Sequence, residues 1–151
     1  MSEKDKNLTF SVLKRNISIV ANQQFLLNIL VSLSIVKTLE GFNIPKLAIK
    51  WPNDILSDHH KISGILIENL IKNKQIEYAI IGIGLNVNQV KFEGLSKVSS
   101  LKNIMPLPVD KDELLTKIID KLKMYFKLYS ENGSEFLNSE YESYLFRKDK
   151  P

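Results

Sequence analysis

The segment 47–88 constrains the fold of this chain most strongly, because it consists of short apolar runs separated by polar turns. The runs are 47–51, 61–68 and 78–87. Each is rich in Ile and Val and is bounded by Asp, Asn, His or Pro, which is typical of strands rather than helices. The polar stretches 57–60 and 72–75 have the composition of hairpin turns. We therefore expect an antiparallel meander over this segment.

A strand and a buried helix are expected before the meander. Leu8–Leu13 alternates apolar and polar residues and predicts a strand. The segment 25–39 is apolar on most faces at helical spacing, which predicts a central, buried helix. Asn22 is expected to cap its N-terminus, and Gly41 its C-terminus.

Two amphipathic helices are expected after the meander. Asp110 and Glu113 form a capping box, which starts a helix that runs to about Tyr129. Ser134 is expected to begin a last helix. The predicted fold class is α+β, with a mixed, largely antiparallel sheet packed against helices.

Composition narrows the classes of function. The chain has 151 residues, enough for one domain with a real core. Its net charge of +4 comes from dispersed lysines, so we expect no nucleic-acid partner. The longest apolar stretch, 25–36, is too short to span a bilayer, and no cysteine is present, so we expect a cytoplasmic protein without a membrane partner. His59 and His60 lie in a polar turn without further ligands, so no metal site is expected in the protein itself.

Three motifs stand in order along the meander. They are K-W-P-N-D at 50–54, K-x-x-G-I-L-x-E at 61–68 and G-x-G-x-N at 82–86. Glycine lowers the stability of a strand, so Gly64, Gly82 and Gly84 are expected to have a specific role. They either allow a ligand to approach the backbone closely or form a β-bulge. The ordered set resembles the biotin protein ligase family, and the resemblance extends from Asn7 to about Arg147.

The resemblance implies a fold and an activity. The fold is the catalytic domain shared by biotin and lipoate ligases, which is similar to class II synthetases. The activity is ATP-dependent conversion of biotin to biotinyl-adenylate, followed by transfer to a lysine of a biotin carboxyl carrier protein domain. ATP and Mg²⁺ are the implied cofactors, and biotin is the implied substrate.

The resemblance also implies roles for individual residues. Lys50 is expected to be the catalytic residue, because its ammonium would lie against the biotin carboxylate and the α-phosphate, where negative charge builds up. The remaining expectations are biotin contacts for Gly64, Ile65 and Gly84, and ATP contacts for Asn86, Asn53 and Asp54. For Asn53 and Asp54, a simple turn is an equally good interpretation.

Two further motif residues, Trp51 and Lys61, are expected to have structural rather than functional roles. The strand pleat predicts that Trp51 faces the core, opposite to Lys50. Lys61 is expected to be a surface residue or a member of a local ion pair.

The chain is expected to correspond to one partial catalytic domain, 1–151. The Gly- and Arg-rich loop that precedes this part of the family, and the small β-barrel that often follows it, have no counterpart in the sequence. One alternative is therefore a non-catalytic or partner-dependent module, acting as a homodimer or with a complementing chain. A lipoate ligase is a further alternative, but the combination of the K-W-P-N-D and G-x-G-x-N motifs favours a biotin ligase.

Overall fold

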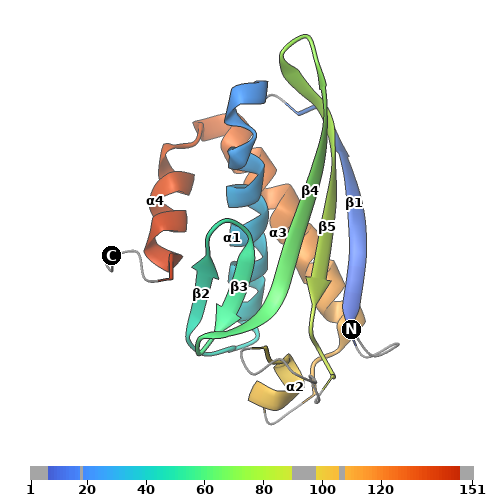
Figure 1. Cartoon of the computed structure of the whole chain (residues 1–151), viewed down its shortest axis with the longest axis vertical. Coiled ribbons are helices and arrows are strands. Elements are labelled where there is room, and N and C mark those ends of the chain that lie inside the picture. The colour runs from blue at the N-terminus through green and yellow to red at the C-terminus, as the bar shows by residue number, and fades with distance from the viewer. Residues whose placement is uncertain (1–6, 18, 90–97, 106–107, 147–151) are drawn as a thin grey trace.

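The chain forms two layers, a five-stranded sheet and a set of helices (Figure 1). A computed structural model describes residues 7–17, 19–89, 98–105 and 108–146. The strands are β1 (Leu8–Arg15), β2 (Leu47–Lys50), β3 (Asp54–Ser57), β4 (His60–Lys72) and β5 (Gln75–Leu85). The helices are α1 (Phe25–Gly41), α2 (Leu101–Ile104), α3 (Lys111–Asn132) and α4 (Glu135–Tyr144), with a short 3₁₀ turn, η1 (Ala21–Gln23), before α1. The α+β class expected from the sequence is confirmed.

The sheet has the strand order β1-β5-β4-β3-β2, and each neighbouring pair is antiparallel. Strands β2 to β5 form an antiparallel meander as expected, but with four strands where three were predicted, and β1 adds to the outer side of β5. The expected mixed sheet is thus an antiparallel one. Parallel pairing among the described residues is confined to two isolated bridges, Ile49 with Leu145 and Lys61 with Val98.

Both expected hairpin turns are present. Asp58 and His59 have φ values of 47° and 69° between β3 and β4, and Asn73 and Lys74 have 54° and 63° between β4 and β5. Two central residues with positive φ are the mark of the two-residue turn that matches strand twist. The Asp and Asn residues tolerate this backbone conformation better than most others, which is why these turns were visible in the sequence.

The two faces of the sheet differ in burial. In β5 the side chains of Ala79, Ile81, Ile83 and Leu85 are buried against the helices, whereas Ile80 on the other face is 41% exposed. We call this second side, which none of the described helices covers, the open face. The alternation follows from the period of two in a strand, and it leaves the open face available for a ligand.

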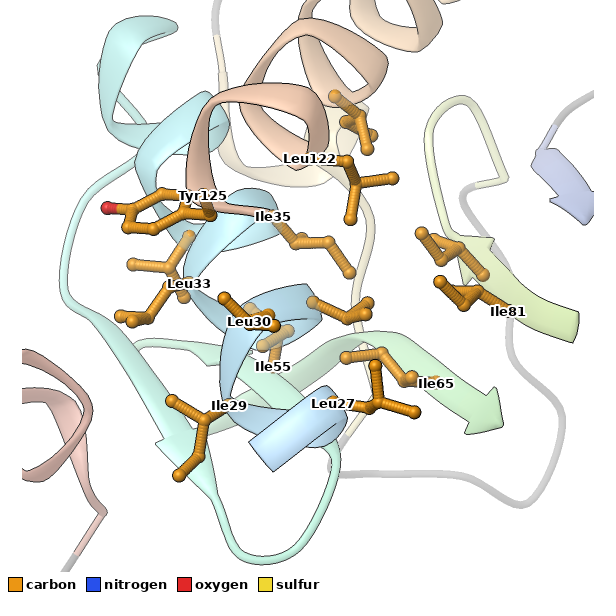
Figure 2. Packing of buried hydrophobic residues seen from close by; sticks show 14 of the residues in the cluster. Leu27, Ile29, Leu30, Leu33, Ile35, Ile55, Ile65, Ile81, Leu122 and Tyr125 are labelled. Carbon is orange, nitrogen blue, oxygen red and sulfur yellow. The ribbon is translucent and has the colours of Figure 1, made fainter. Parts of the chain in front are cut away.

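Helix α1 is the centre of the core. It is apolar nearly all round because it contacts β2, β3 and β4 on one side and α3 and α4 on others. Figure 2 shows Leu27, Leu30 and Leu33 of α1 among side chains from the sheet and α3. By length and composition, Ala21–Gly41 is the described helix that could cross a bilayer, and 67% of its most apolar window is buried in this fold. Its place in the core accounts for its composition.

The ends of α1 differ from the expectation. Asn22 lies within η1, and Gln24 occupies the N-cap position without a side-chain hydrogen bond. At the other end Gly41 is still helical, and the left-handed residue is Asn43, with φ of 63°. The backbone N–H of Ile44 then donates to Leu39 O at 3.1 Å, which closes the helix. Asparagine replaces glycine here because its short polar side chain tolerates the left-handed region.

The expectation for Trp51 was wrong, and one strand was missed. Pro52 ends β2, but the chain turns at once and runs back as β3. Trp51 lies in that turn and is 66% exposed, with its ring 6.1 Å from that of Phe25. The pleat does not continue through a turn, so the alternation that placed Trp51 in the core does not apply.

The two C-terminal helices are confirmed. Asp110 caps α3, and its Oδ1 accepts a hydrogen bond from the backbone N–H of Asp112 at 2.9 Å. α3 ends at Gly133, whose φ of 79° requires a glycine. α4 then packs against α1 and β2.

Candidate functional site

One cross-strand row brings predicted site residues together. The register pairs Lys50 of β2 with Asp54 of β3, Asp54 with Gly64 of β4, Gly64 with Gly84 of β5, and Gly84 with Thr9 of β1. Directly opposed residues lie on the same face of a sheet. The row therefore crosses all five strands on the open face, with two glycines at its centre.

The centre of this row is hollowed into a groove. Two adjoining hollows, of about 400 Å³ and about 250 Å³, share Thr9, Lys61, Gly64 and Gly84. We call their union the open-face groove. The other residues that border it are Asn7, Phe10, Ser11, Asn53, Asp54, Ser63, Ile65, Leu66, Gly82, Ile83, Leu85 and Asn86. Most of the residues predicted for biotin and ATP thus border one hollow.

The three glycines that border the groove differ in what a side chain at their position would contact. A Cβ at Gly84 would meet nothing within 4 Å and would project into the groove. A Cβ at Gly64 would lie 3.4 Å from both Cε and Nζ of Lys61. A Cβ at Gly82 would lie 3.3 Å from the backbone oxygen of Leu66, a tight contact with the neighbouring strand. Gly64 and Gly84 are therefore the positions where glycine leaves room for a ligand.

Lys61 is the cation of the groove. Its Nζ lies 3.3 Å from Oδ1 of Asp54, and its side chain is 45% exposed. The register between β3 and β4 shifts between Ile55 and Leu56, so that Ile62 is an extra residue on β4. Because of this bulge, Lys61 and Gly64 share the open face although they are three residues apart.

The sequence interpretation of Lys61 is half right. The local ion pair exists, but its partner is Asp54 on the neighbouring strand, and the pair borders the groove. A regular strand would place residues 61 and 64 on opposite faces. The spacing alone therefore gave no signal that Lys61 belongs to the site.

Lys50 stands apart from the groove. It is exposed at the end of the edge strand β2 and is not among the residues that border the groove. It does share the open face with Asp54, its register partner. The catalytic role predicted for Lys50 stays a prediction, and Lys61 is the residue with which it must be compared.

Both predicted asparagines hold the backbone together at the groove. Asn53 Nδ2 donates to Ile65 O at 2.8 Å, and Ile65 N–H donates to Asn53 O at 3.2 Å. Asn86 Nδ2 donates to Ser99 O at 3.1 Å, and its backbone N–H donates to Ile62 O. These contacts join the end of β5 to Ser99 and the turn before β3 to β4, beside the groove. ATP contacts of either residue stay predictions.

Ile65 also plays a structural part. Its side chain is 5% exposed and packs in the core with α1 and Ile81 (Figure 2). It also borders the groove, next to Gly64 on β4 and opposite Ile83 on β5. A biotin contact of Ile65 therefore stays a prediction, and its side chain is needed for packing.

The histidines lie away from the groove. His60 Nδ1 is 2.8 Å from Asp58 O, and the ring of His59 lies 5.2 Å from that of Phe146. Within the described parts of the chain, no three His, Asp or Glu side chains are grouped as metal ligands. A divalent cation held by fewer side chains than this would need further oxygen ligands, such as those of a bound ligand.

The fold and the groove define an α+β domain with a groove on the open face of its antiparallel sheet. Comparison with known families gives this class a name. The chain belongs to the biotin/lipoate A/B protein ligase family, whose model matches residues 2–86.

Individual relatives are biotin ligases. The chain is 29% identical over 122 residues to the bifunctional ligase/repressor BirA of Bacillus spizizenii, covering 78% of this chain and 38% of that protein. It is 30% identical over 105 residues to biotin–protein ligase 2 of Arabidopsis thaliana, covering 68% of this chain and 31% of that protein. The chain thus spans less than half the length of these curated relatives.

Solved structures confirm the expected fold. The apo structure of biotin protein ligase from Aquifex aeolicus matches with a TM-score of 0.81 and 26% identity, covering 95% of this chain and 63% of that one. The same ligase in complex with biotin and ATP matches with a TM-score of 0.78 and 26% identity, covering 93% of this chain and 59% of that one.

Proposed function

We propose that this chain carries the biotin-binding and ATP-binding sheet of a biotin–protein ligase. The reaction is activation of biotin by ATP to biotinyl-adenylate, followed by transfer to a lysine of a biotin carboxyl carrier protein domain. The observation that carries the proposal is the open-face groove, in which two glycines leave room beside the ammonium of Lys61. The match to a ligase solved with biotin and ATP supports the choice of ligands.

The chemistry follows from the charges that develop. Attack of the biotin carboxylate on the α-phosphorus builds negative charge on phosphate oxygens. Transfer to the acceptor lysine builds an oxyanion. A fixed ammonium stabilises such charge more in the transition state than in the ground state. We assign this role to Lys61, because it borders the groove, and retain Lys50 as the competing assignment from sequence.

Asp54 positions this ammonium. Its carboxylate lies 3.3 Å from Lys61 Nζ, and this ion pair holds the lysine beside Gly64. A ligand carboxylate or phosphate would compete with Asp54 for Lys61. The freed Asp54 carboxylate would then help to hold a Mg²⁺ ion together with phosphate oxygens, because Mg²⁺ prefers carboxylate and phosphate oxygen ligands.

A partner-dependent function is the second candidate. The chain spans 63% of the Aquifex ligase and 38% of the Bacillus relative, and the open-face groove is shallow. A homodimer or a complementing chain would then supply the remaining wall of the site. The cytoplasmic location inferred from composition stays a prediction. Lipoate is the competing substrate within the family.

Isothermal titration of the purified 151-residue chain with biotin tests the proposal. The titration is run with and without ATP and Mg²⁺, and with lipoate in parallel. Micromolar or tighter binding of biotin, and weaker binding of lipoate, is the expected result. A folded chain that binds neither ligand would exclude autonomous binding and favour the partner-dependent candidate.

A further inference from the structure

We propose that a second groove, between β1 and α3, is a docking site for an amphipathic helix of a partner polypeptide, with acidic residues flanking the apolar face of that helix. This β1–α3 groove has a volume of about 500 Å³ and lies on the helix side of the sheet. It is separate from the open-face groove, and the proposal does not rest on biotin binding.

The floor and one wall of this groove are apolar. Ile19 and Ile81, each 1% exposed, form the floor. Ile119, Leu122 and Phe126 of α3 form the wall, and their spacing of three and four residues places them in one stripe. Ile119 and Phe126 are only half-buried, so the described part of the fold does not cover them fully.

α3 thus has more apolar surface than its contact with α1 requires. Its buried residues Leu114, Ile118 and Tyr125 lie in the core cluster. Ile119 and Phe126 lie on the flank that faces β1. A partner helix with apolar side chains at every third and fourth position would fill such a groove.

The rim of the groove is positively charged. Lys14 of β1 and Lys123 and Lys127 of α3 border it, and no Asp or Glu is among its described lining residues. The Nζ of Lys14 lies 5.2 Å from the centroid of the Phe126 ring, so this lysine reaches across the groove. Carboxylates on the partner would complement these three ammonium groups.

The same charges argue against a second copy of this chain as the occupant. A two-fold contact through the groove would place the same surface on both subunits. Lys14, Lys123 and Lys127 would then face their own counterparts, and like charges across an interface cost affinity.

A polypeptide fits this surface better than a small molecule. The matched Aquifex ligase has a further part of its polypeptide beyond the 63% that this chain covers. The strand β1 beside the groove also has an outer edge that pairs with no other described strand.

Two synthetic peptides of about 18 residues, some five helical turns, test the proposal. One has leucines at every third and fourth position and glutamates elsewhere, and the other has lysines in place of the glutamates. Methyl NMR spectra of the full chain report on binding. We expect the acidic peptide to shift the methyl signals of Ile81 and Ile119 and to bind at least about tenfold more tightly than the basic one.

Charge-reversal variants provide the matched control. Lys123→Glu with Lys127→Glu changes exposed side chains and is expected to reverse the preference between the peptides. Lys117→Glu, also exposed on α3 but outside the groove, is expected to leave it unchanged. Ile119→Trp is expected to fill the groove and weaken binding of the acidic peptide.

Several results would overturn the proposal. These are no binding of the acidic peptide, equal binding of both peptides, or shifts away from Ile81 and Ile119. Decanoate that binds the groove more tightly than the acidic peptide would make it an acyl-chain site instead. Sedimentation that detects a dimer abolished by the double charge reversal would make the second copy the occupant.

Discussion

The Nζ of Lys61 lies 3.3 Å from Oδ1 of Asp54 and 3.4 Å from the position that a Cβ of residue 64 would take. A cation, its carboxylate partner and a glycine thus meet on the uncovered face of the sheet. The arrangement depends on the bulge at Ile62, which turns Lys61 toward the groove.

Removing this cation is expected to weaken biotin binding. Lys61→Ala deletes the proposed partner of the biotin carboxylate, and a hydrogen bond to a charged group contributes about 1.5–3 kcal/mol. Calorimetry should therefore show an affinity loss of roughly ten- to a hundredfold. Lys72→Ala, at the far end of β4, is the control and should bind normally.

Lys50→Ala decides between the two assignments. Because Lys50 is outside the groove lining, we expect this variant to retain most of the biotin affinity. A larger loss for Lys50→Ala than for Lys61→Ala would restore the assignment made from sequence.

A side chain at Gly64 is expected to abolish biotin binding without lowering the stability of the domain. Gly64→Val adds a branched side chain beneath Lys61, and valine is well suited to a strand. The melting temperature should therefore change little, whereas biotin binding should be lost. Gly41→Ala is the control, because its Cβ would meet nothing within 4 Å at the end of α1 and the groove is distant. Unchanged affinity of Gly64→Val would place biotin elsewhere.

The core around α1 sets the stability of the domain. Leu30 is fully buried between the sheet and α3 (Figure 2). Leu30→Ala is expected to lower the free energy of unfolding by about 2–5 kcal/mol, measured by urea denaturation. Leu30→Asp would bury an unpaired charge and should prevent folding. Met124→Ala, at an exposed position of α3, should have little effect.

A charged cluster between α1 and α4 makes stability depend on pH. Burial alone would raise the pKa of Glu40, but hydrogen bonds from Tyr144 and Lys37 outweigh it and lower the pKa below its ordinary value of 4.5. A lowered carboxyl pKa contributes stability above the unfolded-state value, and this contribution is lost as the pH falls through the folded-state value.

Thermal melts at about pH 6 and about pH 3 measure this contribution. The wild-type chain should lose more stability between these conditions than Glu40→Gln. Glu131→Gln, an exposed residue near the end of α3, should behave like the wild type. Equal pH dependence of wild type and Glu40→Gln would show that the cluster does not couple folding to protonation.

Local chemistry made much of this fold predictable. The turns at Asp58 and Asn73 have the residue types that positive φ requires, and Asp110 caps α3 as its position indicated. The short strand β3 was missed because Pro52 was interpreted as the end of an element, whereas it lies in a turn between two strands.

The site was predictable only where it follows the strand period. Gly64 and Gly84 were singled out by the family resemblance of their motifs, and the direct pairing of β4 with β5 brings them together at the groove. Lys61 was missed because the bulge at Ile62 breaks the period of two, and Trp51 was misplaced because it lies in a turn. The β1–α3 groove is lined by segments that lie about a hundred residues apart in the sequence, and no local sequence pattern predicts that they are neighbours in the fold.

The central claim is that biotin binds in the open-face groove beside Lys61. Backbone ¹⁵N–¹H spectra of the 151-residue chain, recorded during titration with biotin, test it most directly. The account predicts that the amide signals of Gly64 and Gly84 shift first and most, and that Lys61→Ala weakens this response. Shifts confined to the β1–α3 groove, or saturating binding that leaves both glycine signals unchanged, would contradict it.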